Sequence, residues 1–361
     1  MHNTLSHRWT AFVSLLFVLL TECFTTSVSF AGEKIGSRIC LLSDLNGPYG
    51  SIALPSGVHS GVARLAQMNC DLALAAGDLV AGQDTSLSNE RLQSMWNEWE
   101  RVVADPFLSR GVPILSALGN HDASAERSSS GGFVFARERM AAASAWNAIL
   151  GKSAYSSVEW LSREQFPFFY AFKFKSAGVI VFDGSSAGEV SRNRVWLERQ
   201  LDILASDAAV KTRIVIGHLP LFAVAKGRET VGNILFDSVE LYQLFNRYRV
   251  DFYVSGHHHA FYPARPALQY NDYGTVLLSL GAMGDGPRKL LNPSAPPARH
   301  SMSVLDISQS ILDPDFFAPQ NFNLQTLSPF DGLLQPSTLL PERLESFDGR
   351  GRPVDLRRID L

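Results

Sequence analysis

The sequence has no excess of basic charge, because 32 lysine and arginine residues face 35 aspartate and glutamate residues and the formal net charge is −3. No basic stripe stands out, so binding to a nucleic acid through many phosphate contacts is not indicated. There is no internal repeat, and no run of like charges is long enough to suggest a disordered tail. With 361 residues, 46% of them hydrophobic, the chain has a globular composition and suffices for one large domain or two ordinary ones.

After the N-terminal region, no hydrophobic run is long enough to span a bilayer. The run Ala11–Leu20 is itself too short for a comfortable span. Small residues at Ser29 and Ala31 complete the pattern of a secretory signal peptide. We therefore expect residues 1–31 to be a signal peptide that is cleaved near Ala31, and the mature protein to be exported to a periplasm or to the exterior. An uncleaved anchor is the alternative.

Cysteine is scarce, with three residues in the chain, and Cys23 lies within the predicted signal peptide. Cleavage would leave Cys40, four residues before Asp44, and Cys70, eight residues before Asp78. If both acids end neighbouring strands at one level, the two cysteines are offset by about four residues, or roughly 13 Å. That distance exceeds the reach of a disulfide, so we expect two buried free thiols.

Apolar strands and amphipathic helices alternate along most of the chain. The strand-like segments are RICLLS, DLALAAGDLV, PILSALGNHD, FFYAFKF, GVIVFDGSS, RIVIGHLPLF, DFYVSGHHHAFYP, GTVLLSLGAMG and MSVLDIS. Helical periodicity lies between the first three, which predicts a mostly parallel sheet with helices on its faces. We expect one domain over 35–308 and a C-terminal extension over 309–361 that lies on this domain or is partly disordered.

Five of the predicted strands end in side chains that can bind a metal: Asp44, Asp78, Asn120 with His121, His218, and His257 with His259. At any one strand end such a residue is ordinary in a turn. Five such strand ends in one chain are not explained by turns alone, because ligands of open α/β sheets bind outside the carboxyl ends of the strands. A glycine directly precedes the polar residue at four of these ends, which allows a sharp exit and a close backbone approach.

The donor types indicate the chemistry. They are oxygen and imidazole nitrogen without a thiolate, which suits Mn, Zn, Fe or Co better than a soft metal. The set is large enough for two ions, and two ions about 3.5–4 Å apart can clamp a phosphoryl group and hold a bridging hydroxide. A bridge requires a carboxylate near the middle of the ligand series, and Asp78 is the natural candidate.

The motifs SDLN, AGDLV, GNHD, GHLP and GHHH, in this order, resemble those of the calcineurin-like metallophosphoesterase family. The resemblance covers residues 35–308, and the segment from FFYAFKF to GHLPLF also resembles the purple acid phosphatase and cyclic-nucleotide phosphodiesterase branches. It implies an α/β fold of two sheets in a sandwich flanked by helices, with the metal site at the C-terminal ends of the strands. It also implies two divalent or trivalent metal ions and hydrolysis of a small-molecule or polymer phosphoester by a metal-activated hydroxide.

The resemblance assigns a role to each motif residue by position. Asp44 and His259 would bind the first metal, and Asp78 would bridge the two ions. The second metal would be bound by the side-chain oxygen of Asn120 and by two histidines, His218 and His257.

The same correspondence gives His121 and Asp122 catalytic roles. His121 would stabilise the phosphoryl charge or protonate the leaving oxygen, unless it only supports a turn. Asp122 would orient His121 or a metal ligand. His258 points the opposite way in an extended segment, so we expect it to face solvent or substrate and not to be a ligand.

Two positions depart from the family pattern. The first motif of the family ends in histidine, where this chain has Asn46, and the purple acid phosphatases have a tyrosine where this chain has Ala81. Asn46 is therefore either a weak ligand or a substrate contact, and Gln83 or water can fill the vacant place on the first metal. The sequence does not separate monoester from diester substrates. A non-catalytic binding protein on a degraded phosphoesterase scaffold is the competing hypothesis, and Asn46 is its only support.

Overall fold

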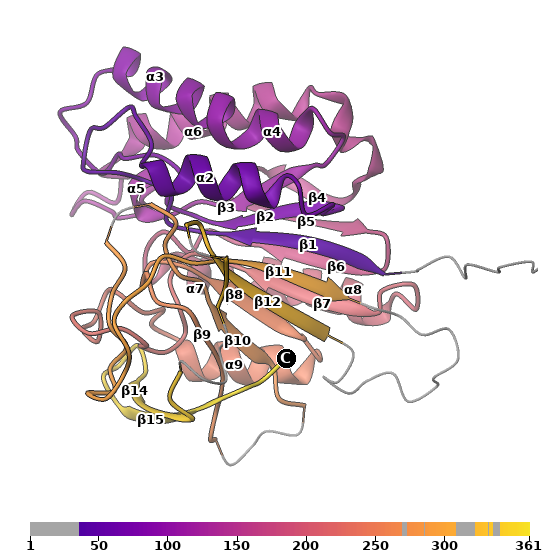
Figure 1. Cartoon of the computed structure of the whole chain (residues 1–361), viewed down its shortest axis with the longest axis vertical. Helices are drawn as coiled ribbons and strands as arrows, with labels where there is room; N and C mark the ends of the chain where they lie inside the picture. Colours follow the sequence, from indigo (N-terminus) through magenta and orange to yellow (C-terminus); the bar gives the residue numbers. More distant parts are fainter. Residues whose placement is uncertain (1–35, 269–272, 285, 308–321, 331, 335–339) are drawn as a thin grey trace, which may run out of the picture. The chain divides into compact units, whose positions relative to one another are not determined.

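The structure is a computed structural model that describes residues 36–268, 273–284, 286–307, 322–330, 332–334 and 340–361 (Figure 1). The predicted signal peptide at 1–31 and Cys23 lie outside the described residues. Within the described part, two β-sheets pack between two layers of helices (Figure 1). This confirms the predicted α/β sandwich.

In the part of the chain that the structure describes, the first sheet contains six strands in the order β13 (Gly332–Leu334), β12 (Phe322–Ser328), β11 (Met302–Ile307), β1 (Ser37–Leu42), β2 (Leu72–Ala76) and β3 (Ile114–Ala117). Strands β1, β2 and β3 are parallel, as the alternation of strands and helices predicted. Their carboxyl ends therefore meet at one edge of the sheet. Strand β11 is antiparallel to β1.

Among the described residues, the second sheet contains nine strands in the order β14 (Arg343–Phe347), β15 (Pro353–Arg358), β9 (Tyr262–Pro266), β10 (Val276–Ser279), β8 (Phe252–Ser255), β7 (Thr212–Ile216), β6 (Ala177–Val181), β5 (Phe169–Phe174) and β4 (Glu159–Gln165). The strands β6, β7, β8 and β10 are parallel. Alternate residues of β7 pack on opposite faces: Ile214 and Ile216 join the core between the sheets, and Val215 joins the core under the outer helices.

Helices cover the outer face of each sheet. The first sheet is covered by α2 (Ser56–Leu65), α3 (Asn89–Trp99) and α6 (Ala136–Leu150), and a π-helical turn at Glu100–Ala104 joins α3 to α4 (Asp105–Leu108). The second sheet is covered by α8 (Arg194–Ser206) and α9 (Ser238–Arg247). The short helices α5 (Asn120–Ala123) and α7 (Glu189–Arg192) lie in the loops after β3 and β6, and a 3₁₀ turn at Ser153–Ser157 precedes β4. No helix of the described part is long and apolar enough to cross a membrane.

Cys40 and Cys70 form a disulfide, with a distance of 5.7 Å between their Cα atoms, so the prediction of two free thiols is wrong. The 13 Å estimate assumed that the chain around Cys70 runs extended beside β1. Instead, β2 begins at Leu72, and Cys70 lies in the turn that connects α2 to β2. The chain turns back towards β1 there, which brings the two cysteines together.

Residues after 308 contribute strands to both sheets. Strand β12 pairs with β11 in the first sheet, and β15 pairs with β9 in the second. Leu324 and Leu327 of β12 join the core between the sheets, and Leu344 and Leu356 of the β14–β15 hairpin join the outer core. The described parts of the C-terminal extension are therefore integrated into the sandwich.

Candidate metal centre

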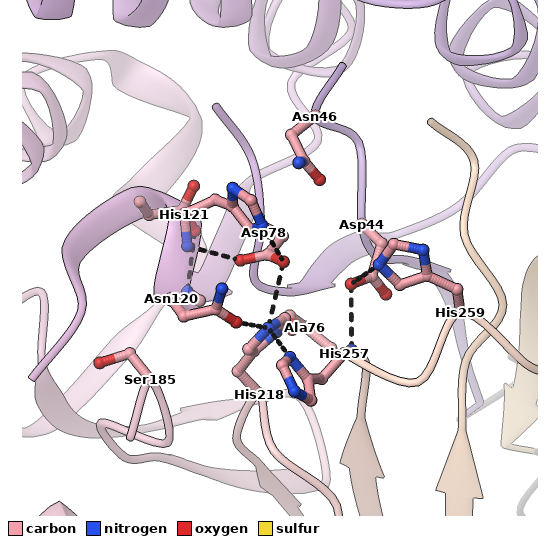
Figure 2. Close-up of polar contacts among 12 residues, drawn as sticks. Asp44, Asn46, Ala76, Asp78, Asn120, His121, Ser185, His218, His257 and His259 are labelled. Carbon is pink, nitrogen blue, oxygen red and sulfur yellow. Dashed lines mark hydrogen bonds and ion pairs between the residues drawn. The ribbon is translucent and has the colours of Figure 1, made fainter. Parts of the chain in front are cut away.

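The polar residues that follow five strands meet at one place, although they come from both sheets (Figure 2). Asp44 and Asp78 follow β1 and β2 of the first sheet, and Asn120 begins α5 just after β3. His218 and His257 follow β7 and β8 of the second sheet. The carboxyl ends of the parallel strands of the two sheets thus face one another, and the ligands predicted from the sequence are brought together there.

The first cluster consists of Asp44, Asp78 and His259, whose ligand atoms all lie within 4.8 Å of one another. His259 Nε2 is 3.3 Å from Asp44 Oδ1. The other ring nitrogen, Nδ1, is 2.8 Å from the main-chain oxygen of Gly286, to which it donates a hydrogen bond. This bond leaves the Nε2 lone pair free to face the carboxylates.

The second cluster consists of Asp78, His218 and His257. His218 Nε2 lies 3.3 Å from Asp78 Oδ2, 3.3 Å from His257 Nδ1 and 3.0 Å from Asn120 Oδ1. Asp78 belongs to both clusters, which is the place that a bridging carboxylate would occupy.

Hydrogen bonds on the far side of each imidazole fix its tautomer. His218 Nδ1 donates to the main-chain oxygen of Ala76 at 2.7 Å, and His257 Nε2 donates to Asn233 Oδ1 at 3.1 Å. The remaining ring nitrogens, together with Asn120 Oδ1 and the carboxylates, are acceptors that face one another. Acceptors repel at such distances unless a cation lies between them, so these residues fit a metal site.

Electrostatics and burial support the same conclusion. Asp44 is fully buried, and its Oδ2 has no hydrogen-bond partner in the described part of the chain. Burial lowers the pKa of His218, but Asp78 outweighs it and raises this pKa to about 9. Burial and the neighbouring His218 hold the pKa of His257 well below its usual value. The buried carboxylates of Asp44 and Asp78 therefore favour one positive charge beside them, whether a proton on His218 or a metal ion supplies it.

Four of the clustered residues have left-handed backbones, with φ values of 52° at Asp44, 56° at Asp78, 63° at His257 and 51° at His259. This conformation is uncommon for residues with side chains and concentrates at functional sites. The glycines that precede the ligands have no Cβ atom, so neighbouring parts of the chain can approach them closely. A Cβ atom on Gly256 would overlap the side chain of Ser43, which confirms the reason given for that glycine.

His121 lies beside the clusters. Its main-chain N–H donates to Asp78 Oδ1 at 2.9 Å, and its Nε2 is 4.0 Å from Asp78 Oδ2. The imidazole lies 4.8 Å from the ring of Tyr49, measured between ring centroids. A cavity of about 560 Å³ opens here, and His121, Tyr49, Asn120 and His257 all line it. His121 is therefore placed to contact a ligand in the cavity.

Asp122 contacts main-chain groups. It is buried, and it accepts hydrogen bonds from the N–H groups of Leu79 (2.6 Å), Val80 (2.9 Å) and Gly119 (2.8 Å). Burial and Asp78 raise its pKa to about 8, whereas the N–H groups of Gly119 and Val80 lower it. Asp122 thus joins the loop that carries Asp78 to the loop that carries Asn120. Of the two roles expected for it, the contacts favour orientation of a metal ligand.

The sequence left open whether Asn46 or Gln83 reaches the first metal, and the two side chains have different surroundings in the structure. The side chain of Asn46 is buried and turned towards the carboxylates of Asp44 and Asp78 (Figure 2), and its Nδ2 donates to the oxygen of Gly47 at 3.3 Å. Gln83 Oε1 accepts a hydrogen bond from Asn120 Nδ2 at 2.8 Å. Gln83 therefore fixes the amide of Asn120, so that Oδ1 faces His218, and does not contact Asp44.

The expectation that His258 faces solvent or substrate is wrong. The side chain is buried, its Nδ1 accepts from the N–H of Val224 at 3.1 Å, and its Nε2 donates to the oxygen of Asn233 at 3.1 Å. Burial lowers its pKa to about 3. The prediction assumed an extended segment, whereas His257 and His259 have left-handed backbones and the loop that follows β7 covers His258.

Sequence reasoning missed three residues of the cavity. Tyr49 packs on His121, Asn233 orients His257, and Arg228 lines the cavity and donates to Asn233 Oδ1 at 2.8 Å. All three lie in loops without a recognisable motif, so their placement depends on the fold alone.

Comparison with known proteins was consistent with this geometry. The family model for calcineurin-like phosphoesterases matches residues 37–261. A purple acid phosphatase from yellow lupin has 15% sequence identity over 83% of this chain, with a TM-score of 0.57, which shows a common fold. The alignment covers 52% of that phosphatase, so this chain spans about half its length.

Two further structures are similar at lower scores. A dimetal phosphatase from Danio rerio has 11% identity and a TM-score of 0.43, with 77% of this chain and 96% of that chain covered. GAP50, the anchor in the inner membrane complex of Plasmodium, has 13% identity and a TM-score of 0.45, with 82% and 86% covered. No curated protein matches the chain in sequence.

Proposed function

The chain belongs to the calcineurin-like phosphoesterase family, and we propose that it is an exported enzyme that hydrolyses phosphomonoesters or phosphodiesters at a dinuclear metal centre. The observation that carries this proposal is the overlap of two potential metal-binding clusters at Asp78. A shared carboxylate between two such clusters is what a pair of ions clamping one phosphoryl group requires.

In this proposal Asp44 and His259 would hold the first metal, and Asp78 would contribute to both sites. The second metal would be held by Asn120, His218 and His257. Bound metal ions would supply the Lewis acidity that activates water and offsets the charge on the phosphoryl group. Mn, Zn, Fe and Co all suit these oxygen and nitrogen donors.

His121 is the proposed acid or charge-stabilising group. Its ring is held between the bond from its main-chain N–H to Asp78 and the contact with Tyr49, and it lines the cavity. A proton held at Nε2 can be donated to a phosphoryl oxygen or to the leaving oxygen. Asp122 contributes indirectly, because it holds the loop that carries Asp78.

The test combines metal analysis with a chromogenic monoester and a chromogenic diester. Protein treated with a chelator should lose hydrolysis, and one of the four candidate metals should restore it. Asp78→Asn should lose both metal and activity, and Asp202→Asn, a substitution of an exposed acid on α8, is the matched control. Absence of bound metal, with no rescue by any of the four, would contradict the dinuclear proposal.

Asn46 supports one competing function, a binding protein on a degraded phosphoesterase scaffold. A neutral amide is a poorer ligand than the histidine that the family has in its first motif, so the first metal could be too weakly held for turnover. That hypothesis predicts metal binding without hydrolysis of any phosphoester in the same assay. The intact ligand set around Asp78 favours the enzyme.

Export is supported by two independent features. The N-terminal sequence has the pattern of a cleaved signal peptide, and Cys40 and Cys70 form a disulfide, which is typical of oxidising compartments. The N-terminal sequence of the protein isolated from its native source should begin shortly after Ala31. An intact N-terminus on cytosolic protein would refute this part of the proposal.

A further inference from the structure

Arg228 lies in the loop between β7 and α9 and lines the cavity next to the candidate metal centre, together with His121, His257 and Asn233. Its side chain is partly buried. Its guanidinium donates through one terminal nitrogen to Asn233 Oδ1 at 2.8 Å, the oxygen that also accepts from His257 Nε2. Arg228 is therefore on the same side of the cavity as the ligands of the second metal.

Arg228 differs from the other arginines that line this cavity. Arg127 lies 2.9 Å from Glu189, and Arg192 lies 3.2 Å from the same carboxylate. Among the described residues Arg228 forms no ion pair with a carboxylate, and its Nε is buried there without a hydrogen-bond partner. A partly buried guanidinium with unused donors is a site for an anion.

The charges around Arg228 strengthen this interpretation. Burial and the neighbouring cation Arg288 lower the pKa of Arg228, whereas Asp78 and Asp44 raise it. Its charge is thus within electrostatic reach of both candidate metal clusters. Metal ions at Asp44 and Asp78 would neutralise those carboxylates. Arg228 would then present uncompensated positive charge in the cavity where a phosphoryl group would bind.

We propose that Arg228 binds the non-bridging oxygens of a phosphomonoester dianion, and that the site therefore prefers terminal phosphomonoesters to phosphodiesters. This inference rests on the proposed function. A monoester at neutral pH carries about one more negative charge than a diester and has an additional free oxygen. Arg228 can donate to the additional free oxygen of the monoester and offset its extra charge, whereas in a diester that oxygen is esterified.

The competing role for Arg228 is purely structural. Because it bonds Asn233, and Asn233 bonds His257, the arginine could act only by positioning a metal ligand. A positioning role predicts loss of metal together with an equal loss of activity on both substrate classes. A substrate-binding role predicts loss on the monoester with metal content preserved.

The test compares Arg228→Met with Lys226→Met, which removes an exposed cation from the same loop and so matches the change in net charge. For each variant, the experiment measures metal content, kcat/KM for p-nitrophenyl phosphate and for bis(p-nitrophenyl) phosphate, and the Kd of inorganic phosphate for the metal-loaded protein. Arg228→Met should lower kcat/KM for the monoester by about 10- to 100-fold and weaken phosphate binding by about 10-fold or more, the usual worth of hydrogen bonds to a charged group. The diester rate should change by less than about 3-fold, because the charged bonds it makes to Arg228 are fewer. Arg228→Lys, which keeps the charge but loses the planar fork, should give intermediate values.

Two outcomes would overturn the inference: Arg228→Met indistinguishable from Lys226→Met, or equal losses on both substrates accompanied by loss of metal. If the wild-type protein hydrolyses neither substrate with any of the candidate metals, the proposed function fails, and the phosphate measurement decides on Arg228 by itself. Weaker phosphate binding in Arg228→Met alone would then still support the anion site, and unchanged binding would refute it.

Discussion

Replacing Gln83 by alanine should weaken the second metal site selectively. Gln83 Oε1 accepts from Asn120 Nδ2 at 2.8 Å and thereby turns Asn120 Oδ1 towards His218. Loss of one neutral hydrogen bond costs about 1 kcal/mol, or about fivefold in affinity. The freed amide can then also rotate its NH₂ group towards the cation, so we expect a loss of about 10- to 100-fold, as for other groups that orient metal ligands.

Metal titration against a competing chelator, followed by calorimetry, measures this effect. Wild-type protein should bind two equivalents, and Gln83→Ala should retain the affinity of the site at Asp44 and His259 while weakening the other. Gln83→Glu keeps an acceptor for Asn120 Nδ2 and should retain most of the affinity. Equal weakening of both sites, or no weakening at all, would refute the idea that Gln83 acts by orienting Asn120.

Three further predictions concern residues whose roles differ in kind. His121→Ala should lower turnover by about 10²–10⁴-fold with metal content near normal. Asp78→Ala should lose metal as well as activity, and equal metal loss in both variants would show that His121 is a ligand. Asn46→His should tighten the first metal if the amide faces it and shift substrate preference alone if it faces the phosphoester, which metal titration and a substrate panel would distinguish. Replacing Cys40 and Cys70 by alanine should lower the free energy of unfolding by about 3–4 kcal/mol, because the disulfide closes a loop between residues 30 apart. Wild-type stability of this variant in urea denaturation, or two titratable thiols in the native protein, would contradict the disulfide.

Local sequence was sufficient to predict the strands that carry the candidate metal ligands and the residues at their ends, but not β4 or the strands β12 to β15. A buried strand is recognisable from a short apolar run, and the polar residue that stops it, as in Asp44 and Asp78, marks the carboxyl end of the strand. In parallel strands these ends share one edge, so the sequence alone already predicted that such residues would meet. The motif spacing also predicted the family, which the match over residues 37–261 confirms.

The features that the sequence did not reveal depend on where a loop travels after it leaves a strand. Cys70 approaches Cys40 because the chain turns before β2 begins, and His258 is buried because later loops cover it. Arg228 likewise reaches the site from a loop without a motif, and Gln83, which the sequence suggested for the first metal, contacts Asn120 instead. The path of such loops is set by long-range packing and hydrogen bonding, and neither leaves a periodic pattern in the residues that make it. The sequence by itself therefore determined which side chains could bind metal ions, whereas the tertiary structure alone decided which side chains surround them.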